Sequence, residues 1–166
     1  MSLLVAAIGA TVTAIFELTA GPYLRVGDAQ PHFVLGFTII VTVAVGLESG
    51  LASAFVGGVV LDALAQRPLG VTPFALIVCV GVAAVAARAF ARFRPIIVVP
   101  AVAVLSLVYS MTSFVLLGVL RMQIAIGDPL ATLLPGVAYD ALFAIAIGPL
   151  AIALYDRYAG EERVDW

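Results

Sequence analysis

Residues 46–70, GLESGLASAFVGGVVLDALAQRPLG, combine small side chains at helical spacing with a single aspartate, Asp62, near the end of an apolar segment. The small residues on one face of this segment are Gly46, Gly50, Ser53, Ala54, Gly57 and Gly58. Small side chains let helix backbones approach closely, which is how helices associate in lipid. The stretch therefore predicts a membrane helix with a packing face, used either inside one bundle or against a partner protein.

The composition indicates that the whole chain lies in a membrane. Hydrophobic residues make up 64% of the 166 residues and charged residues only 11%, well below the roughly 25% of soluble domains. The mean hydropathy is +1.21. A net charge of −2, without a basic cluster, argues against nucleic-acid binding. We expect a single integral membrane domain over residues 1–166 and no soluble domain.

Six apolar runs follow one another, and a membrane-spanning helix needs about 20 mainly apolar residues. The expected helices are 3–24, 33–47, 50–66, 73–90, 96–120 and 133–155, followed by a short polar tail at 156–166. The second and third runs as one helix would be about 50 Å long and would overshoot the bilayer. A turn is therefore required, and its candidate residues are Gly46, Glu48, Ser49 and Gly50. We predict an all-α bundle of six transmembrane helices, with five helices and one re-entrant segment as the alternative.

The arginines favour one orientation of this bundle. Five arginines lie next to the predicted helix ends on the same side of the membrane as both termini: Arg88, Arg92, Arg94, Arg157 and Arg163. Three lie next to the helix ends on the opposite side: Arg25, Arg67 and Arg121. Connections rich in Arg and Lys stay on the cytoplasmic side. We therefore predict that both termini are cytoplasmic.

Three acids interrupt the apolar runs: Glu17, Asp62 and Asp140. A carboxylate at the centre of a membrane helix costs about 3 kcal/mol, so each acid needs a partner. In the predicted topology all three fall in the outer half of the membrane, near the arginines of that side. We expect them to line an outward-opening polar pocket. For Asp62, a hydrogen bond to a helix end or to Arg67 is the structural alternative.

The sequence offers little for catalysis or metal binding. Cys79 is the only cysteine and His32 the only histidine, which excludes a disulfide within the chain and a metal site built on paired cysteines or histidines. Nucleophile-elbow, zinc-protease and phosphate-loop motifs are absent from the sequence. We expect a protein that is not an enzyme and that needs no cofactor.

Two stretches resemble the MreD family of rod shape-determining membrane proteins. In that family a Gly-rich third helix reaches an Asp and is followed by a Pro-Leu-Gly turn, matched here by Gly50, Gly57, Gly58, Asp62, Pro68, Leu69 and Gly70. Upstream, Glu17 and Pro31 match the family's polar residue late in the first helix and its proline before the second. His32 stands where the family pattern has an acid.

The resemblance implies a non-enzymatic subunit of the bacterial cell-elongation complex in the plasma membrane. Its implied partners are MreC, MreB, RodA and a class B penicillin-binding protein, in lateral peptidoglycan synthesis. The family's fold is similar to the S-components of energy-coupling-factor transporters, so a vitamin-binding S-component is the competing hypothesis. A third possibility, an intramembrane enzyme or proton-coupled carrier, would require Glu17, Asp62 or Asp140 to titrate.

Overall fold

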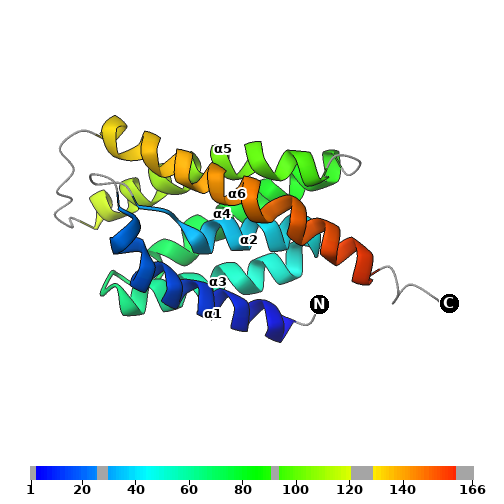
Figure 1. Ribbon diagram of the computed structural model, residues 1–166. Coiled ribbons are helices and arrows are strands. Elements are labelled where there is room, and N and C mark those ends of the chain that lie inside the picture. Colours follow the sequence, from blue (N-terminus) through cyan, green and yellow to red (C-terminus); the bar gives the residue numbers. More distant parts are fainter. Residues whose placement is uncertain (1–2, 26–29, 91–93, 121–128, 160–166) are drawn as a thin grey trace.

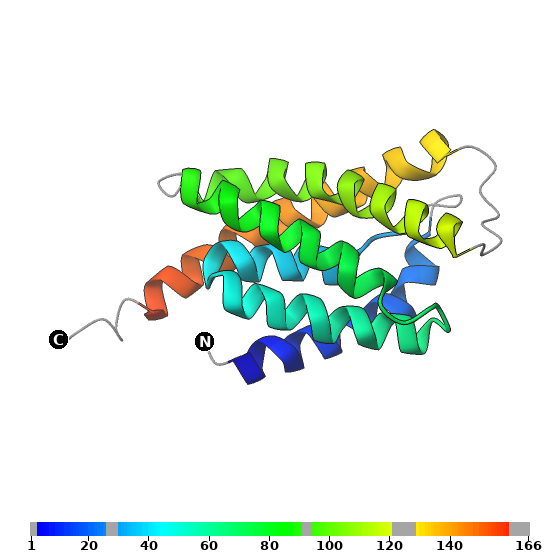
Figure 2. The same ribbon diagram turned by 180° about the vertical axis from the view of Figure 1, so that it is seen from behind.

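The computed structural model describes residues 3–25, 30–90, 94–120 and 129–159 of the 166. Its elements are α1 (Leu3–Ala20), the short 3₁₀ helix η1 (Gly21–Leu24), α2 (Phe33–Ala44), α3 (Leu47–Leu64), α4 (Val71–Ala89), α5 (Arg94–Val119) and α6 (Pro129–Ala159). Successive helices run in opposite directions, so α1 begins and α6 ends at the same end of the bundle (Figures 1 and 2). We call the end of the bundle where α1 begins and α6 ends the terminal end, and the opposite end of the bundle the distal end. The prediction of an all-α bundle of six helices is confirmed.

Five of the helical segments are long and apolar enough to span a membrane, and α2 is a shorter apolar helix. The required turn lies at Gly46, whose φ of +132° suits glycine. Glu48, Ser49 and Gly50 are not part of the turn, because α3 already begins at Leu47. The sixth helix was expected to end at 155, but it continues to Ala159; residues 160–166 lie outside the described part.

The short helix α2 is the centre of the bundle. Every one of its residues except Phe37 is buried, and it packs against all the other α-helices. Twelve residues give a helix of about 18 Å, whereas the hydrocarbon core of a bilayer is about 30 Å thick. At least one end of α2 therefore lies at a depth where its backbone groups cannot rely on bulk water.

The small residues of α3 face neighbouring helices within the bundle. Gly50, Ser53, Ala54, Gly57 and Gly58 are all buried. A Cβ on Gly57 would lie 2.9 Å from Val34 Cγ1 and 3.2 Å from Ala10 Cβ, while one on Gly58 would lie 2.6 Å from the backbone of Pro73. On Gly50 it would collide with the Thr42 hydroxyl. A partner helix therefore has no access to this face while α1, α2 and α4 cover it.

Two glycines provide a matched test of this packing. We expect Gly58→Ala to lower the free energy of unfolding by about 1–3 kcal/mol, because its methyl group would press on the Pro73 backbone. Gly81→Ala in α4 is the control, since a Cβ there meets nothing within 4 Å and alanine favours a helix by up to about 1 kcal/mol. Thermal unfolding of the detergent-purified proteins measures both. Equal stability of the two variants would contradict the close approach of α3 and α4.

Candidate functional site

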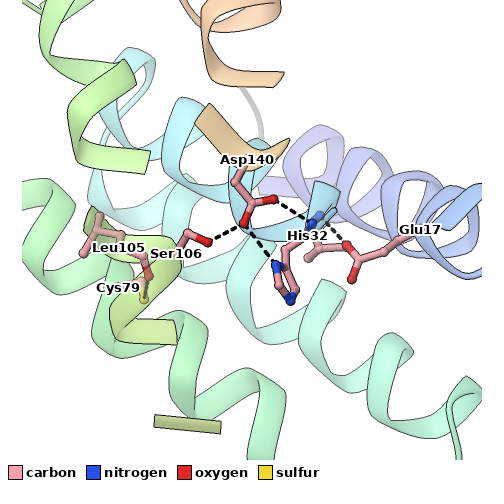
Figure 3. Close-up of polar contacts among 7 residues, drawn as sticks. Glu17, His32, Cys79, Leu105, Ser106 and Asp140 are labelled. Atoms are coloured by element: carbon pink, nitrogen blue, oxygen red, sulfur yellow. Dashed lines mark hydrogen bonds and ion pairs between the residues drawn. The ribbon is translucent and has the colours of Figure 1, made fainter. Parts of the chain in front are cut away.

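The N-terminal end of α2 is held by carboxylates from two other helices. Its N-cap residue, His32, makes no side-chain capping bond. Instead, the backbone N–H of His32 donates to Asp140 Oδ1 of α6 at 2.7 Å, and the N–H of Val34 donates to Glu17 Oε2 of α1 at 2.7 Å (Figure 3). The first N–H groups of a helix lack partners within it and carry a partial positive charge. The two acids therefore accept hydrogen bonds from N–H groups that lack a partner within α2, and they suit the partial positive charge at its start.

Asp140 is also the centre of a wider polar cluster, in which it is 1% exposed. Its Oδ2 lies 3.0 Å from His32 Nδ1 and accepts a hydrogen bond from the Ser106 hydroxyl of α5 (Figure 3). The imidazole of His32 also meets the ring of Tyr109 edge-on, with centroids 5.1 Å apart. Asp140 thus joins the start of α2 to both α5 and α6.

Asp62 holds the start of α4 in the same manner. The carboxylate is fully buried, and its Oδ2 accepts hydrogen bonds from the backbone N–H groups of Gly70 at 2.9 Å and Thr72 at 3.2 Å. The N-cap of α4, Gly70, has no side chain to serve as a cap and takes the left-handed conformation, with φ of +106°. The Pro68-Leu69-Gly70 turn therefore returns the chain so that α4 begins beside Asp62.

The cavity beside Glu17 is not a common pocket for the three acids. A cavity of about 40 Å³ is lined by Glu17 together with Arg67 and Gln30, but Asp62 and Asp140 do not line it. The side chain of Arg67 is exposed, and only its backbone N–H bonds to Asp62, through the carbonyl oxygen. Of the other arginines expected there, Arg25 is exposed at the surface and Arg121 lies outside the described residues.

The residues that sequence reasoning missed are those that meet the acids. From the sequence, His32 stands out only as the sole histidine and as a departure from a family pattern, and Ser106 and Tyr109 do not stand out. A lone histidine between a proline and an apolar run was the available signal. The decisive donors are backbone N–H groups, which every residue except proline has, so no sequence motif marks them.

The arrangement provides anchoring and little chemistry. No group of three potential metal ligands occurs among the described residues. The thiol of Cys79 is buried and donates to the Leu105 carbonyl oxygen at 3.5 Å (Figure 3). One carboxylate oxygen, Asp62 Oδ1, is buried without a hydrogen-bond partner in the described part of the chain. The acids therefore act here as acceptors for helix ends.

We expect Glu17→Gln to be nearly as stable as the wild type, because an amide oxygen can still accept the Val34 N–H. Glu17→Ala leaves that N–H without its acceptor and should cost about 0.5–2 kcal/mol, as loss of a helix cap does. Thermal unfolding in detergent compares the two variants. If Glu17→Gln were as damaging as Glu17→Ala, the hydrogen bond to the Val34 N–H would not be the main contribution of Glu17, and the capping account would be wrong.

The ion pair between His32 and Asp140 should make stability depend on pH. Burial favours the neutral imidazole, but the hydrogen bond and charge of Asp140 outweigh it and raise the pKa of His32 above its ordinary value of 6.5. A histidine whose pKa is higher in the folded protein than in the unfolded chain stabilises the fold when it is protonated. This stabilisation is complete at a pH below the ordinary pKa and is lost as the pH rises through the raised pKa. The unfolding temperature of the wild type should therefore fall as the pH rises above the ordinary pKa of histidine, about 6.5.

The variant His32→Gln, which keeps the backbone N–H but cannot become charged, should show a smaller decrease over the same pH range. An unfolding temperature with the same pH profile in both proteins would contradict the ion-pair assignment.

Comparisons with known proteins bear on the identity of the chain. A search of the curated proteins and one of the solved structures find no match. The family model for rod shape-determining protein MreD matches residues 1–158, which include all three acids, the Gly-rich α3 and the Pro68-Leu69-Gly70 turn. This chain therefore belongs to the MreD family of rod shape-determining membrane proteins.

Proposed function

We propose that the protein is a non-enzymatic subunit of the bacterial cell-elongation complex. It would regulate rod shape and lateral peptidoglycan synthesis by binding an MreC-like membrane protein, alongside RodA and a class B penicillin-binding protein. Membership of the MreD family supports a role in rod shape. The partner and its position in the complex are part of the proposal.

The observation that carries the proposal is the use of the three acids. Glu17, Asp62 and Asp140 each accept hydrogen bonds from the start of a neighbouring helix. A proton-coupled carrier or an intramembrane enzyme would need at least one such carboxylate free to exchange protons or to meet a substrate. Carboxylates that hold helix ends are better suited to a subunit whose function is to present a defined surface.

The surface available to a partner is the outside of the bundle. Large apolar side chains face away from the bundle on α1, on α4 and on α5 and α6, among them Phe16, Phe74, Phe114 and Leu142. The small face of α3 would serve a partner indirectly, because it sets how closely α1 and α4 pack. Substitutions on that face would then disturb partner binding by changing the shape of the bundle.

An S-component of a vitamin transporter is the competing proposal. Such a protein would need a pocket for its ligand, and small-molecule pockets usually measure about 300–1,000 Å³. The cavity beside Glu17 and Arg67, at about 40 Å³, is much smaller. Its size favours the adaptor over the transporter subunit.

We also propose that the terminal end of the bundle faces the cytoplasm, in the bacterial plasma membrane. Arg88 and Arg157 lie in the last turns of α4 and α6, both of which finish at this end (Figure 1). An arginine excess on one side is typical of the cytoplasmic side.

Depletion of the sole gene copy in a rod-shaped host tests the function. We expect the cells to become round, and both the wild type and Glu17→Gln to restore rods, because the amide keeps the acceptor for Val34. The wild type should also recover an MreC-like protein on co-purification. Cell width and immunoblots of membrane abundance are the measurements.

Three results would contradict the proposal. Rods that persist after deletion would remove the shape role, and vitamin auxotrophy with co-purified ATPases would favour the S-component. Round cells despite normal abundance of Glu17→Gln would indicate that this carboxyl group must titrate.

A further inference from the structure

A cavity of about 140 Å³ lies at the C-terminal end of α2, at the terminal end of the bundle. It is lined by residues 42–47, which form the last turn of α2 and the turn into α3, and by Ala84, Ala87 and Arg88 of α4. Its volume is several times what one water molecule needs. The cavity is larger than the one beside Glu17 and lies at the opposite end of the bundle from it.

Three residues that line this cavity have backbone carbonyl groups without a hydrogen-bond donor in the described part of the chain. The carbonyl oxygen of Val41 accepts hydrogen bonds from the N–H groups of Val45 at 2.8 Å and Gly46 at 3.3 Å. Within the described part of the chain, no donor reaches the carbonyl oxygens of the next three residues, 42–44. The end of a helix carries a partial negative charge and favours a cation. These oxygens are therefore free to accept hydrogen bonds from groups outside the chain.

Arg88 brings the opposite charge to the same cavity. Its side chain is exposed in the last turn of α4, and it forms no ion pair with any other residue that the structure describes. A guanidinium group binds phosphate oxygens with two parallel hydrogen bonds. The cavity therefore presents a phosphate-binding group beside a set of hydrogen-bond acceptors.

We propose that this cavity binds the headgroup of an aminophospholipid, such as phosphatidylethanolamine, from the adjacent leaflet. The phosphate lies against Arg88, and the primary ammonium donates to the carbonyl oxygens of residues 42–44. An ammonium has three N–H donors and no acceptor, which suits a site lined by carbonyl groups. Basic pockets between transmembrane helices bind the phosphate-bearing headgroups of some lipids.

The position of the cavity agrees with a lipid ligand. It is formed where α2 and α4 end, so an occupant lies at the depth of the headgroups and its acyl chains can extend along the apolar outer face of α4. That face includes Val78, Val82 and Val85, all exposed. The proposal is independent of partner binding, because it rests only on α2, the turn into α3 and α4.

Lipid retention by the full-length protein tests the proposal. The purified wild type would be exchanged into nanodiscs of phosphatidylethanolamine, phosphatidylcholine or phosphatidylglycerol with identical acyl chains, and the lipid that stays bound would be counted by native mass spectrometry. We expect about tenfold stronger retention of phosphatidylethanolamine than of phosphatidylcholine, a difference of about 1.4 kcal/mol. The choline headgroup carries the same charge but has no N–H donor.

Two arginine variants locate the site. Arg88→Gln should reduce retention of both phosphatidylethanolamine and phosphatidylcholine, because the phosphate that Arg88 binds is common to the two lipids. Arg157→Gln is the matched control, because Arg157 is also exposed near the terminal end but does not line the cavity, and it should retain the lipid as the wild type does. Both replace an exposed side chain, and a single symmetrical elution peak checks that each is folded.

Three outcomes would overturn the proposal. Equal retention of phosphatidylethanolamine and phosphatidylcholine would show that the carbonyl groups do not bind an ammonium. Equal losses in Arg88→Gln and Arg157→Gln would show general attraction of the basic end to lipid, without a site. Retention of phosphatidylglycerol as strong as that of phosphatidylethanolamine would also contradict the role of the carbonyl groups.

Discussion

The structure depends on one constraint: α2 is buried inside the bundle although it is shorter than the hydrocarbon core of a bilayer. The backbone groups at the ends of α2 lack partners within the helix, and each one left unsatisfied in an apolar environment costs several kcal/mol. At the distal end the solution comes from Glu17 of α1 and Asp140 of α6. The first and last helices of the chain are thereby fixed to the second, and α5 joins them through Ser106.

The same physical solution explains the position of Asp62. This acid lies two residues before the end of α3, where the partial negative charge of its own helix disfavours a carboxylate. The start of α4 supplies N–H groups and a partial positive charge at that point. Asp62 and Gly70 are therefore mutually dependent, since the acid needs the returning helix and the helix has no cap of its own.

The sequence predicted the number and order of the helices, because long apolar runs are a strong signal. It also predicted that Glu17, Asp62 and Asp140 would need partners. It predicted a shared polar pocket for them, and a hydrogen bond to a helix end only as the alternative for Asp62. The capping role of Glu17 and Asp140 was not predicted, because the groups they bind are backbone N–H groups of residues such as Val34. The sequence also did not indicate that α2 lies at the centre of the bundle, because an apolar run this short is only a weak signal for a membrane-spanning helix.

The two ends of α2 differ in a way that bears on how the protein responds to its surroundings. The distal end is tied by charged side chains from α1 and α6, so movement there would leave buried carboxylates without donors. The terminal end is followed by the turn at Gly46, where a Cβ would meet nothing within 4 Å, and by a cavity lined by residues whose carbonyl groups have no donor in the described part of the chain. A rearrangement at the terminal end breaks no such bond. Lipid or partner binding is therefore best placed to change the shape of the bundle through the turn between α2 and α3, while the three acids hold the distal end fixed.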